Sequence, residues 1–248
     1  MTLTGIYGKN YCKVDKSQIV EIKKGQTGTG LLIENDGYLS IDEGKRKSIV
    51  ESRDEGNFFV PNPFIVDAVF QKYGIKNANG RIYPESVLKK QVEEYQKRID
   101  EKRAYGECNH PSESTIDLGR ISHNIIELHW EGRTLVGKME LNITEGYRRH
   151  GVVSSYGDTI ANLLLNGYKI GVSSRGLGSV EQKMGQYIVG DDFELICWDC
   201  VSDPSTPNAY ISTKGEEGLK QYMESDETKK EMSRIDEKIK KIESILKD

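Results

Sequence analysis

The chain has 248 residues, enough for one large domain or for a medium-sized domain with appendages, and in either case enough to bury a hydrophobic core. Charged residues make up 30% and hydrophobic residues 36%, but 2 Trp, 13 Tyr and 5 Phe argue against a disordered chain. The formal net charge of -4 leaves no basic footprint for nucleic acid, and no run of about eighteen apolar residues is present, so we expect neither nucleic acid nor a membrane as a main partner.

The N-terminus lacks the basic start and apolar stretch of a secretory signal, so a cytoplasmic location is expected. The cysteines Cys12, Cys108, Cys197 and Cys200 are irregularly spaced, which favours reduced thiols. Cys197 and Cys200 could form half a zinc site with Cys108 and His110. Residues three apart in a strand point to opposite faces, however, and a second Cys-x-x-Cys is missing, so we predict no metal and no cofactor. Nothing near Cys108 would lower its thiol pKa, which disfavours it as a nucleophile.

Residues 1–56 are rich in Lys, Glu, Asp and Gly, and their short apolar runs predict an N-terminal extension or a small, weakly packed module. The composition changes at Asn57, and Phe64–Phe70 predicts the first strand of a main domain. Pro84 and Glu85 open a helix whose apolar positions recur at spacings of three and four and which ends near Ala104. We therefore place the start of the main domain near residue 57.

The second half of this domain is predicted to consist of strands around one helix, followed by a tail. The predicted elements are a hairpin of Gly119–Trp130 and Arg133–Leu141, a helix over Gly157–Asn166 that stops at Gly167, and a second hairpin over Gln186–Val201 turned at Gly190–Asp192. Beyond about Ser225 the chain is highly charged and its apolar positions repeat at three and four, which predicts a helical tail that pairs with a partner or docks on its own domain. The predicted organisation is an extension over 1–56, a domain over 57–212 and a charged helical tail over 213–248.

One stretch, Gly171-Val172-Ser173-Ser174-Arg175-Gly176-Leu177-Gly178-Ser179, combines hydroxyls, a cation and three glycines. A glycine-rich strand and turn would account for it. The functional interpretation is a nucleophilic serine beside a cation where an oxyanion develops. The stretch is not a nucleophile elbow, because Arg175 stands where that motif needs glycine, and it is not a phosphate loop, because the Gly-Lys pair is absent.

A serine nucleophile of the familiar kind needs a histidine base and an acid that orients it. His110 is the candidate base, because it lies between Asn109 and Pro111, where regular packing does not explain an imidazole; a turn histidine bonded to backbone is the alternative. Asp199 lies in an otherwise apolar strand, and a buried carboxylate needs a partner. That partner is a histidine, or else a backbone group or an arginine.

Four segments occur in a fixed order along the chain. They are Asn79-Gly80-Arg81-Ile82-Tyr83-Pro84, Gly106-Glu107-Cys108-Asn109-His110-Pro111, the stretch from Gly171 to Ser179, and Asp199-Cys200-Val201-x-x-Pro204-Ser205-x-Pro207-x-Ala209. Together they resemble the prohead core proteases of T-even-type tailed bacteriophages, a family related to the herpesvirus capsid-maturation protease, assemblin. The resemblance runs from about Phe64 to Tyr210. It implies an α+β fold with a herpesvirus-protease-like, mainly antiparallel β-barrel flanked by helices.

The resemblance also implies an activity: a serine endopeptidase that cleaves phage scaffold and capsid proteins inside the assembling prohead, in the host cytoplasm. Carried over by position, Ser173 is the nucleophile, His110 the general base and Asp199 the acid that orients the imidazole. The oxyanion is expected to be stabilised by backbone N–H groups around Ser174, Arg175 and Gly176, together with the Arg175 side chain.

Finally, the resemblance implies cleavage after Glu with Leu or Ile two residues earlier, and self-processing at such triplets. The candidate self-cleavage sites are Glu21, Glu34, Glu43, Glu51 and Glu237. Such triplets also occur by chance, as Ile125-Ile126-Glu127 shows. The alternative function is a non-enzymatic prohead scaffold or assembly component on the same fold. The sequence leaves open whether the chain forms a homo-oligomer.

Overall fold

The computed structural model describes residues 20–111 and 114–202, and the structural statements below concern these residues. The helical tail predicted over 213–248 and the candidate cleavage site at Glu237 lie outside the described residues. None of the helices in the described part of the chain has both the length and the apolar character needed to cross a membrane.

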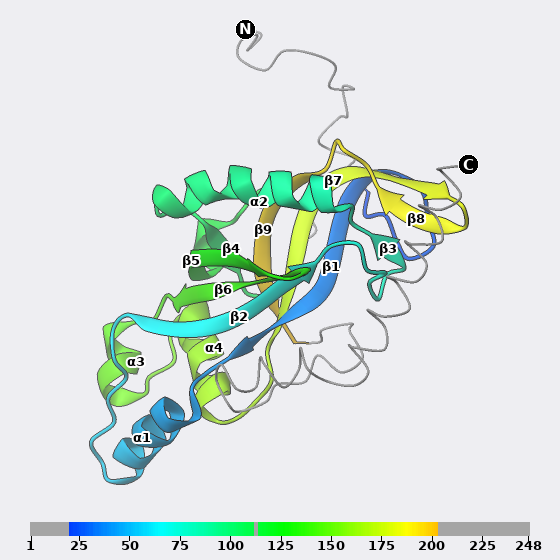
Figure 1. The fold of residues 1–248 in the computed structure, drawn as a ribbon. Helices are drawn as coiled ribbons and strands as arrows, with labels where there is room; N and C mark the ends of the chain where they lie inside the picture. Colours follow the sequence, from blue (N-terminus) through cyan, green and yellow to red (C-terminus); the bar gives the residue numbers. More distant parts are fainter. Residues whose placement is uncertain (1–19, 112–113, 203–248) are drawn as a thin grey trace, which may run out of the picture.

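A single strongly curved sheet dominates the molecule (Figure 1). In chain order, its strands within the described ranges are β1 (Gly28–Ser40), β2 (Phe64–Lys72), β3 (Arg81–Ile82), β4 (Tyr105–Glu107), β5 (Ile121–Glu131), β6 (Thr134–Leu141), β7 (Gly171–Lys183), β8 (Gln186–Val189) and β9 (Glu194–Val201). The strand order is β3-β8-β7-β1-β2-β6-β5-β4, with β9 paired to β7. Only the β3–β8 pairing of these strands is parallel, which confirms the predicted mainly antiparallel sheet.

The helices flank this sheet. They are α1 (Glu43–Asp54), α2 (Glu85–Asp100), α3 (Glu145–His150) and α4 (Tyr156–Leu165). Figure 1 shows α2 lying along the sheet beside β9. Helices α1, α3 and α4 lie together at the opposite end of the molecule from β8. The predicted helix over Gly157–Asn166 is confirmed as α4, which begins with a capping box at Ser155 and Asp158 and is followed by Gly167 with a φ of +80°.

The long helix α2 is also confirmed, although it ends at Asp100 and not near Ala104. Its predicted stripe of Leu88, Val92, Tyr95 and Ile99 is buried in the core. Tyr95 packs edge-on against Trp198 of β9, with ring centroids 5.0 Å apart. The helix therefore covers the face of the sheet to which Trp198 points.

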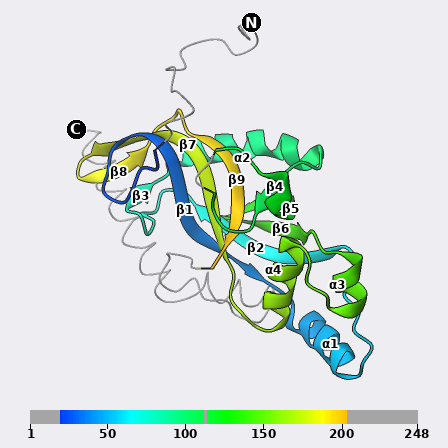
Figure 2. The ribbon, with the colours of Figure 1, turned by 180° about the vertical axis from the view of Figure 1, so that it is seen from behind.

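The two ends of the curved sheet approach each other without closing a barrel. Figure 2 shows β9 between β7 and β4. β4 and β9 are joined by an isolated bridge between Cys108 and Cys200, and the N–H of Asn109 donates to the Cys200 carbonyl oxygen over 2.8 Å. β4 has only three residues, and the chain turns away at Asn109, whose φ is +64°. The predicted mainly antiparallel β-barrel is thus present as a curved sheet that does not close, with its edges touching at one bridge.

The hairpin predicted over residues 186–201 is wrong. β8 pairs with Val180–Lys183 of β7, and β9 pairs with Gly171–Leu177 of the same strand. Because β7 has 13 residues, one of its edges holds both partners in succession while β1 occupies the other edge. The alternation of apolar residues in β8 and β9 correctly predicts two strands. It does not predict that both strands pair with β7 instead of with each other.

The predicted boundary near residue 56 is also wrong, because β1 lies in the middle of the sheet, paired with β7 on one side and β2 on the other. The alternation of apolar and polar residues expected of a strand is interrupted in β1 by the buried charge of Glu34. It is also interrupted by glycines where a neighbouring backbone comes close. A Cβ on Gly30 would lie 2.2 Å from the Val20 carbonyl oxygen, and one on Gly37 would lie 2.1 Å from the Val69 carbonyl oxygen. Residues 28–54 therefore belong to the same unit as the rest of the sheet.

The first of the four segments, Asn79–Pro84, has a structural role. Together with the loop before β3, it surrounds the buried carboxylate of Glu34. The side-chain amides of Asn77 and Asn79 donate to Oε2 over 2.7 and 2.8 Å, and the Tyr83 hydroxyl donates to Oε1 over 3.0 Å. Arg81 Nη1 lies 2.5 Å from Oε1. Burial raises the pKa of Glu34, and the Arg81 charge and these hydrogen bonds oppose that rise.

We expect Arg81→Met to destabilise the protein strongly. It leaves the Glu34 carboxylate buried without its counter-ion, and breaking a buried ion pair on one side typically costs about 3–5 kcal/mol. The loss in unfolding free energy should shrink as the pH falls toward the ordinary pKa of a glutamate, because protonated Glu34 carries no unpaired charge. Urea denaturation at several pH values measures it.

The double variant Glu34→Gln/Arg81→Met is the matched control, since it removes both charges. It should recover part of the stability lost by Arg81→Met. A single variant as stable as wild type at neutral pH would contradict the assignment of this pair as a structural anchor.

Candidate active site

Ser173, His110 and Asp199 come from three separate segments and meet at one point. Ser173 on β7 lies directly opposite Asp199 on β9 in the strand register. His110 follows β4 in the loop that begins at the bridge between the sheet edges. His110 Nε2 lies 2.5 Å from Ser173 Oγ, and His110 Nδ1 lies 3.0 Å from Asp199 Oδ2. The order hydroxyl, imidazole, carboxylate is the one that a serine nucleophile requires.

The Asp199 carboxylate is fully buried and is bound on several sides. The N–H of Glu107 donates to Oδ1 over 3.0 Å, and Arg175 Nε lies 3.0 Å from Oδ2. Burial acts to raise the pKa of Asp199, but the His110 hydrogen bond, the Arg175 charge and the Glu107 N–H together hold it below its ordinary value. An ionised Asp199 accepts the proton of His110 Nδ1, which leaves Nε2 free to accept from Ser173.

Arg175 does not lie where an oxyanion would form. Its side chain is fully buried, and it bridges two carboxylates, through Nε to Asp199 and through Nη2 to Glu107. The expected contribution of the Arg175 side chain to oxyanion stabilisation is therefore wrong. Nη2 also lies 3.2 Å from Cys197 Sγ, so the contacts identified for the guanidinium are all to buried protein groups.

The backbone around Ser174 is also unsuited to an oxyanion hole. Ser174 is paired on both sides, with Glu34 of β1 and Trp198 of β9, and the N–H groups of a doubly paired strand point toward its neighbours in the sheet. Gly176 likewise does not lie open to a substrate, because a Cβ there would lie 2.4 Å from the ring of Phe193. The donors proposed at Ser174, Arg175 and Gly176 are therefore not supported by their position.

The site is nearly closed in this conformation. Ser173 is fully buried, and the His110 side chain is 16% exposed. Solvent therefore reaches the pair over the imidazole ring, and a peptide carbonyl needs a local movement to contact Ser173 Oγ.

A structural histidine, His123, packs against the second segment, where it pairs with Gly106. His123 on β5 is buried, with Nε2 3.1 Å from the Trp198 carbonyl oxygen and Nδ1 2.9 Å from Ser122 Oγ. Burial lowers the pKa of His123 to about 4, so it is neutral near pH 7. Gly106 makes room for this ring, because a Cβ there would lie 2.2 Å from His123 Nε2. Gly106 is therefore needed for packing, because a side chain at this position would collide with His123.

The thiols do not compete for the role of nucleophile. Cys108, Cys197 and Cys200 are free and buried, and burial raises the pKa of each thiol above its ordinary value. Among the residues that the structure describes, no three His, Cys, Asp or Glu side chains are grouped so as to hold a metal ion.

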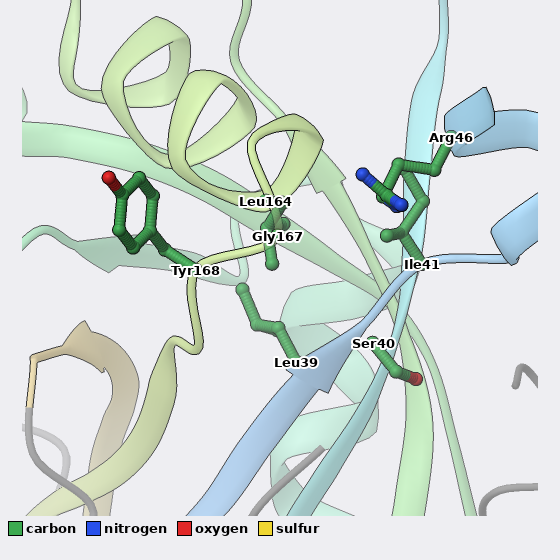
Figure 3. Close-up of a pocket in the computed structure, with 7 residues that line it drawn as sticks. All are labelled: Leu39, Ser40, Ile41, Arg46, Leu164, Gly167 and Tyr168. Atoms are coloured by element: carbon green, nitrogen blue, oxygen red, sulfur yellow. The ribbon is translucent and has the colours of Figure 1, made fainter. Parts of the chain in front are cut away.

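A small pocket lies away from these three side chains, at the end of β1 beside α4 (Figure 3). It is lined by Leu39, Ser40, Ile41, Arg46, Leu164, Gly167 and Tyr168, and its volume is about 20 Å³. That volume suits a single water and no larger ligand. None of its lining residues belongs to the candidate active site.

The candidate self-cleavage sites fall into different surroundings. Glu21 is exposed in an extended segment that bridges to Leu31 of β1. Glu43 and Glu51 lie in helix α1, and Glu34 is fully buried at the centre of β1. Because Glu34 is fully buried and its strand is paired within the sheet, the folded protein does not offer it for cleavage. The self-cleavage site predicted at Glu34 is corrected on this ground.

With this geometry established, comparison with known proteins identifies the family. A family model described as prohead core protein serine protease matches residues 31–218. The chain belongs to this family. The matched span begins within β1, in agreement with the sheet topology.

A sequence comparison and a structure comparison, both with a protease of phage T4, agree with this assignment. The prohead core protein protease of Enterobacteria phage T4 is 32% identical over 169 residues, which cover 67% of this chain and 76% of the relative. A solved structure of the bacteriophage T4 capsid assembly protease, gp21, matches with a TM-score of 0.57 and 26% identity, over 71% of this chain and 99% of that one. The α+β fold predicted for a prohead core protease is therefore confirmed.

Sequence reasoning missed one residue of the site, Glu107. Its carboxylate is fully buried, contacts Arg175, and accepts from the N–H of Asp117 over 3.1 Å. The sequence offered one indication of its role: Glu107 is an acidic residue three positions before His110, in a segment whose other residues are suited to burial. That signal does not name a partner, because Arg175 is 68 residues away along the chain.

Proposed function

We propose that this member of the prohead core proteases is an active serine endopeptidase in which Ser173 is the nucleophile, His110 the general base and Asp199 the orienting acid. The observation that carries the proposal is the hydrogen-bonded series from Ser173 Oγ through the His110 ring to Asp199. Its substrates are the scaffold and capsid proteins of the assembling prohead. Family membership supports this, as does the similarity to the bacteriophage T4 capsid assembly protease.

The geometry supports a two-step mechanism. His110 Nε2 takes the Ser173 proton as Oγ attacks the scissile carbonyl, and Asp199 stabilises the imidazolium that forms. The imidazolium then gives its proton to the leaving amine, which produces an acyl-enzyme. In the second step, His110 removes a proton from water as the water oxygen attacks the acyl carbon. The bond from that carbon to Ser173 Oγ then breaks, the imidazolium returns its proton to Oγ, and the new carboxylate is released.

Cleavage is proposed to follow Glu in Leu-x-Glu or Ile-x-Glu sequences. The direct test compares a Leu-x-Glu peptide with the Leu-x-Gln peptide of the same length, using purified wild-type protein and mass spectrometry of the products. Cleavage after Glu and much slower cleavage after Gln supports the proposal. Absence of cleavage, together with no labelling of Ser173 by a fluorophosphonate, would instead favour a non-enzymatic assembly component.

We expect self-processing after Glu21 and none after Glu34. Glu21 is exposed and extended, and its neighbour Val20 is 69% exposed, whereas Glu34 is fully buried. After cleavage, the new N-terminus at Ile22 retains its place, because the Ile22 nitrogen already donates to the Leu31 carbonyl oxygen over 2.9 Å. Mass spectrometry of incubated wild-type protein measures the products.

Two control variants belong to this experiment. Glu21→Gln should suppress the cut at that position, and Ser173→Ala should leave the chain intact. An intact wild-type chain after long incubation, or a product that ends at Glu34, would contradict the prediction.

A further inference from the structure

We propose that the buried ion pair of Glu107 and Arg175 is a positioning device for Asp199, which fixes the orientation of its carboxylate and keeps its negative charge effective at His110. This inference rests on the proposed protease function and assigns roles to two residues that do not contact a substrate. Both side chains are fully buried, as is Asp199. The three carboxylate and guanidinium groups form one continuous cluster.

The positioning part follows from the contacts. Arg175 Nε lies 3.0 Å from Asp199 Oδ2, and its Nη2 lies 3.4 Å from Oδ1, so the guanidinium meets both carboxylate oxygens. Glu107 binds both partners: its N–H donates to Asp199 Oδ1 over 3.0 Å, and its carboxylate contacts Arg175 Nη2. These contacts leave the carboxylate little freedom to rotate away from His110 Nδ1.

The effect on the charge at His110 follows from adding the charges of the three buried side chains. Arg175 alone would cancel the charge of Asp199, and His110 would then face a neutral pair. Glu107 adds a second negative charge, so the cluster of Glu107, Arg175 and Asp199 carries a net charge of about -1, which favours the imidazolium formed during catalysis. Because these groups are removed from water, their interactions are only weakly screened.

Among the other titratable groups around the site, the thiols and His123 add no charge to this sum, whereas Arg120 adds a partly screened positive charge. Burial keeps the thiols of Cys108, Cys197 and Cys200 protonated, and His123 is neutral near pH 7. The Arg120 Nε lies 3.9 Å from Glu107 Oε1, but the Arg120 side chain is 33% exposed, so solvent partly screens its charge.

A purely structural role is the competing explanation, because the same ion pair also links β4 to β7. The two explanations differ in how activity depends on pH. A structural pair, once broken, lowers stability and activity together. A charge-setting pair also moves the pH at which activity falls on the acid side.

The test measures kcat and KM for a Leu-x-Glu peptide against pH in four proteins: wild type, Glu107→Gln, Arg175→Met and the double variant. Glu107→Gln leaves Arg175 cancelling Asp199, so the acid limb of kcat/KM should move to lower pH by about one unit, with kcat reduced roughly 10- to 100-fold. Arg175→Met should move the limb to higher pH. The double variant restores the net charge, so its limb should return close to that of wild type while kcat stays low.

Two conservative variants provide the control and remain informative if the neutral variants do not fold. Glu107→Asp and Arg175→Lys keep the charges but alter their geometry, so kcat should fall while KM and the acid limb stay in place. An unchanged acid limb in folded Glu107→Gln would overturn the proposal. So would a shifted limb in both conservative variants, or an unchanged kcat in both.

Failure of this inference is distinguishable from failure of the proposed function. If wild-type protein does not cleave the peptide, or if Ser173→Ala cleaves it equally well, the protease assignment itself fails. If wild type cleaves in a Ser173-dependent manner and the variants show no shift of the acid limb, only the role given to Glu107 and Arg175 fails.

Discussion

Ser173→Ala is expected to lower kcat/KM for a Leu-x-Glu peptide by at least about 10⁴-fold, because it removes the atom that attacks the carbonyl. Stability should change little, since the substitution deletes one hydroxyl and keeps the β7 backbone. Product formation by mass spectrometry over long incubations measures the residual rate, and thermal unfolding verifies the fold.

Ser174→Ala is the matched control for this prediction. The neighbouring serine is also fully buried, but alternation along β7 turns it to the opposite face, and its Oγ has no hydrogen-bond partner among the described residues. Its removal should leave kcat/KM within about threefold of wild type. If Ser174→Ala abolished cleavage and Ser173→Ala did not, the nucleophile would be misassigned.

Asp199→Asn should lower kcat by about 10³- to 10⁴-fold. A neutral amide gives the imidazolium no counter-charge, and its N–H₂ group can force the wrong tautomer on His110. KM should change much less, because Asp199 is buried behind His110 and has no direct access to substrate. Steady-state kinetics separate the two constants.

The same variant has a pH signature in stability. Because the pKa of Asp199 is lowered in the folded protein, its ionised form stabilises wild type above the ordinary pKa of an aspartate, near 4, and this contribution is lost as the pH falls through the folded-state pKa. Urea denaturation should therefore show wild type more stable than Asp199→Asn near neutral pH, with the difference narrowing in acid. A difference that grows as the pH falls would contradict the assignment of an ionised Asp199.

The local elements of the second half could be predicted because their signals are short-range. The stripe on α2, the hairpin of β5 and β6 turned at Gly132, and the glycine stop after α4 each depend on residues a few positions apart. The strand β1 could not be found in this way. Glutamate is usually exposed, so the sequence predicts Glu34 at the surface. Its burial depends on the ion pair with Arg81, which lies 47 residues later in the chain.

The sequence by itself determined the candidate chemistry: a hydroxyl, an imidazole and a carboxylate in Ser173, His110 and Asp199, which lie in three of the four segments that resemble the family. Only the tertiary structure decided how they meet, since His110 lies 63 residues from Ser173 and 89 from Asp199 along the chain. Strand register sets this geometry, because side chains alternate across a sheet and a shift of one residue exchanges its two faces. That alternation places Ser173 against the imidazole and Ser174 on the opposite face of the sheet, and it turns Arg175 toward the buried carboxylates.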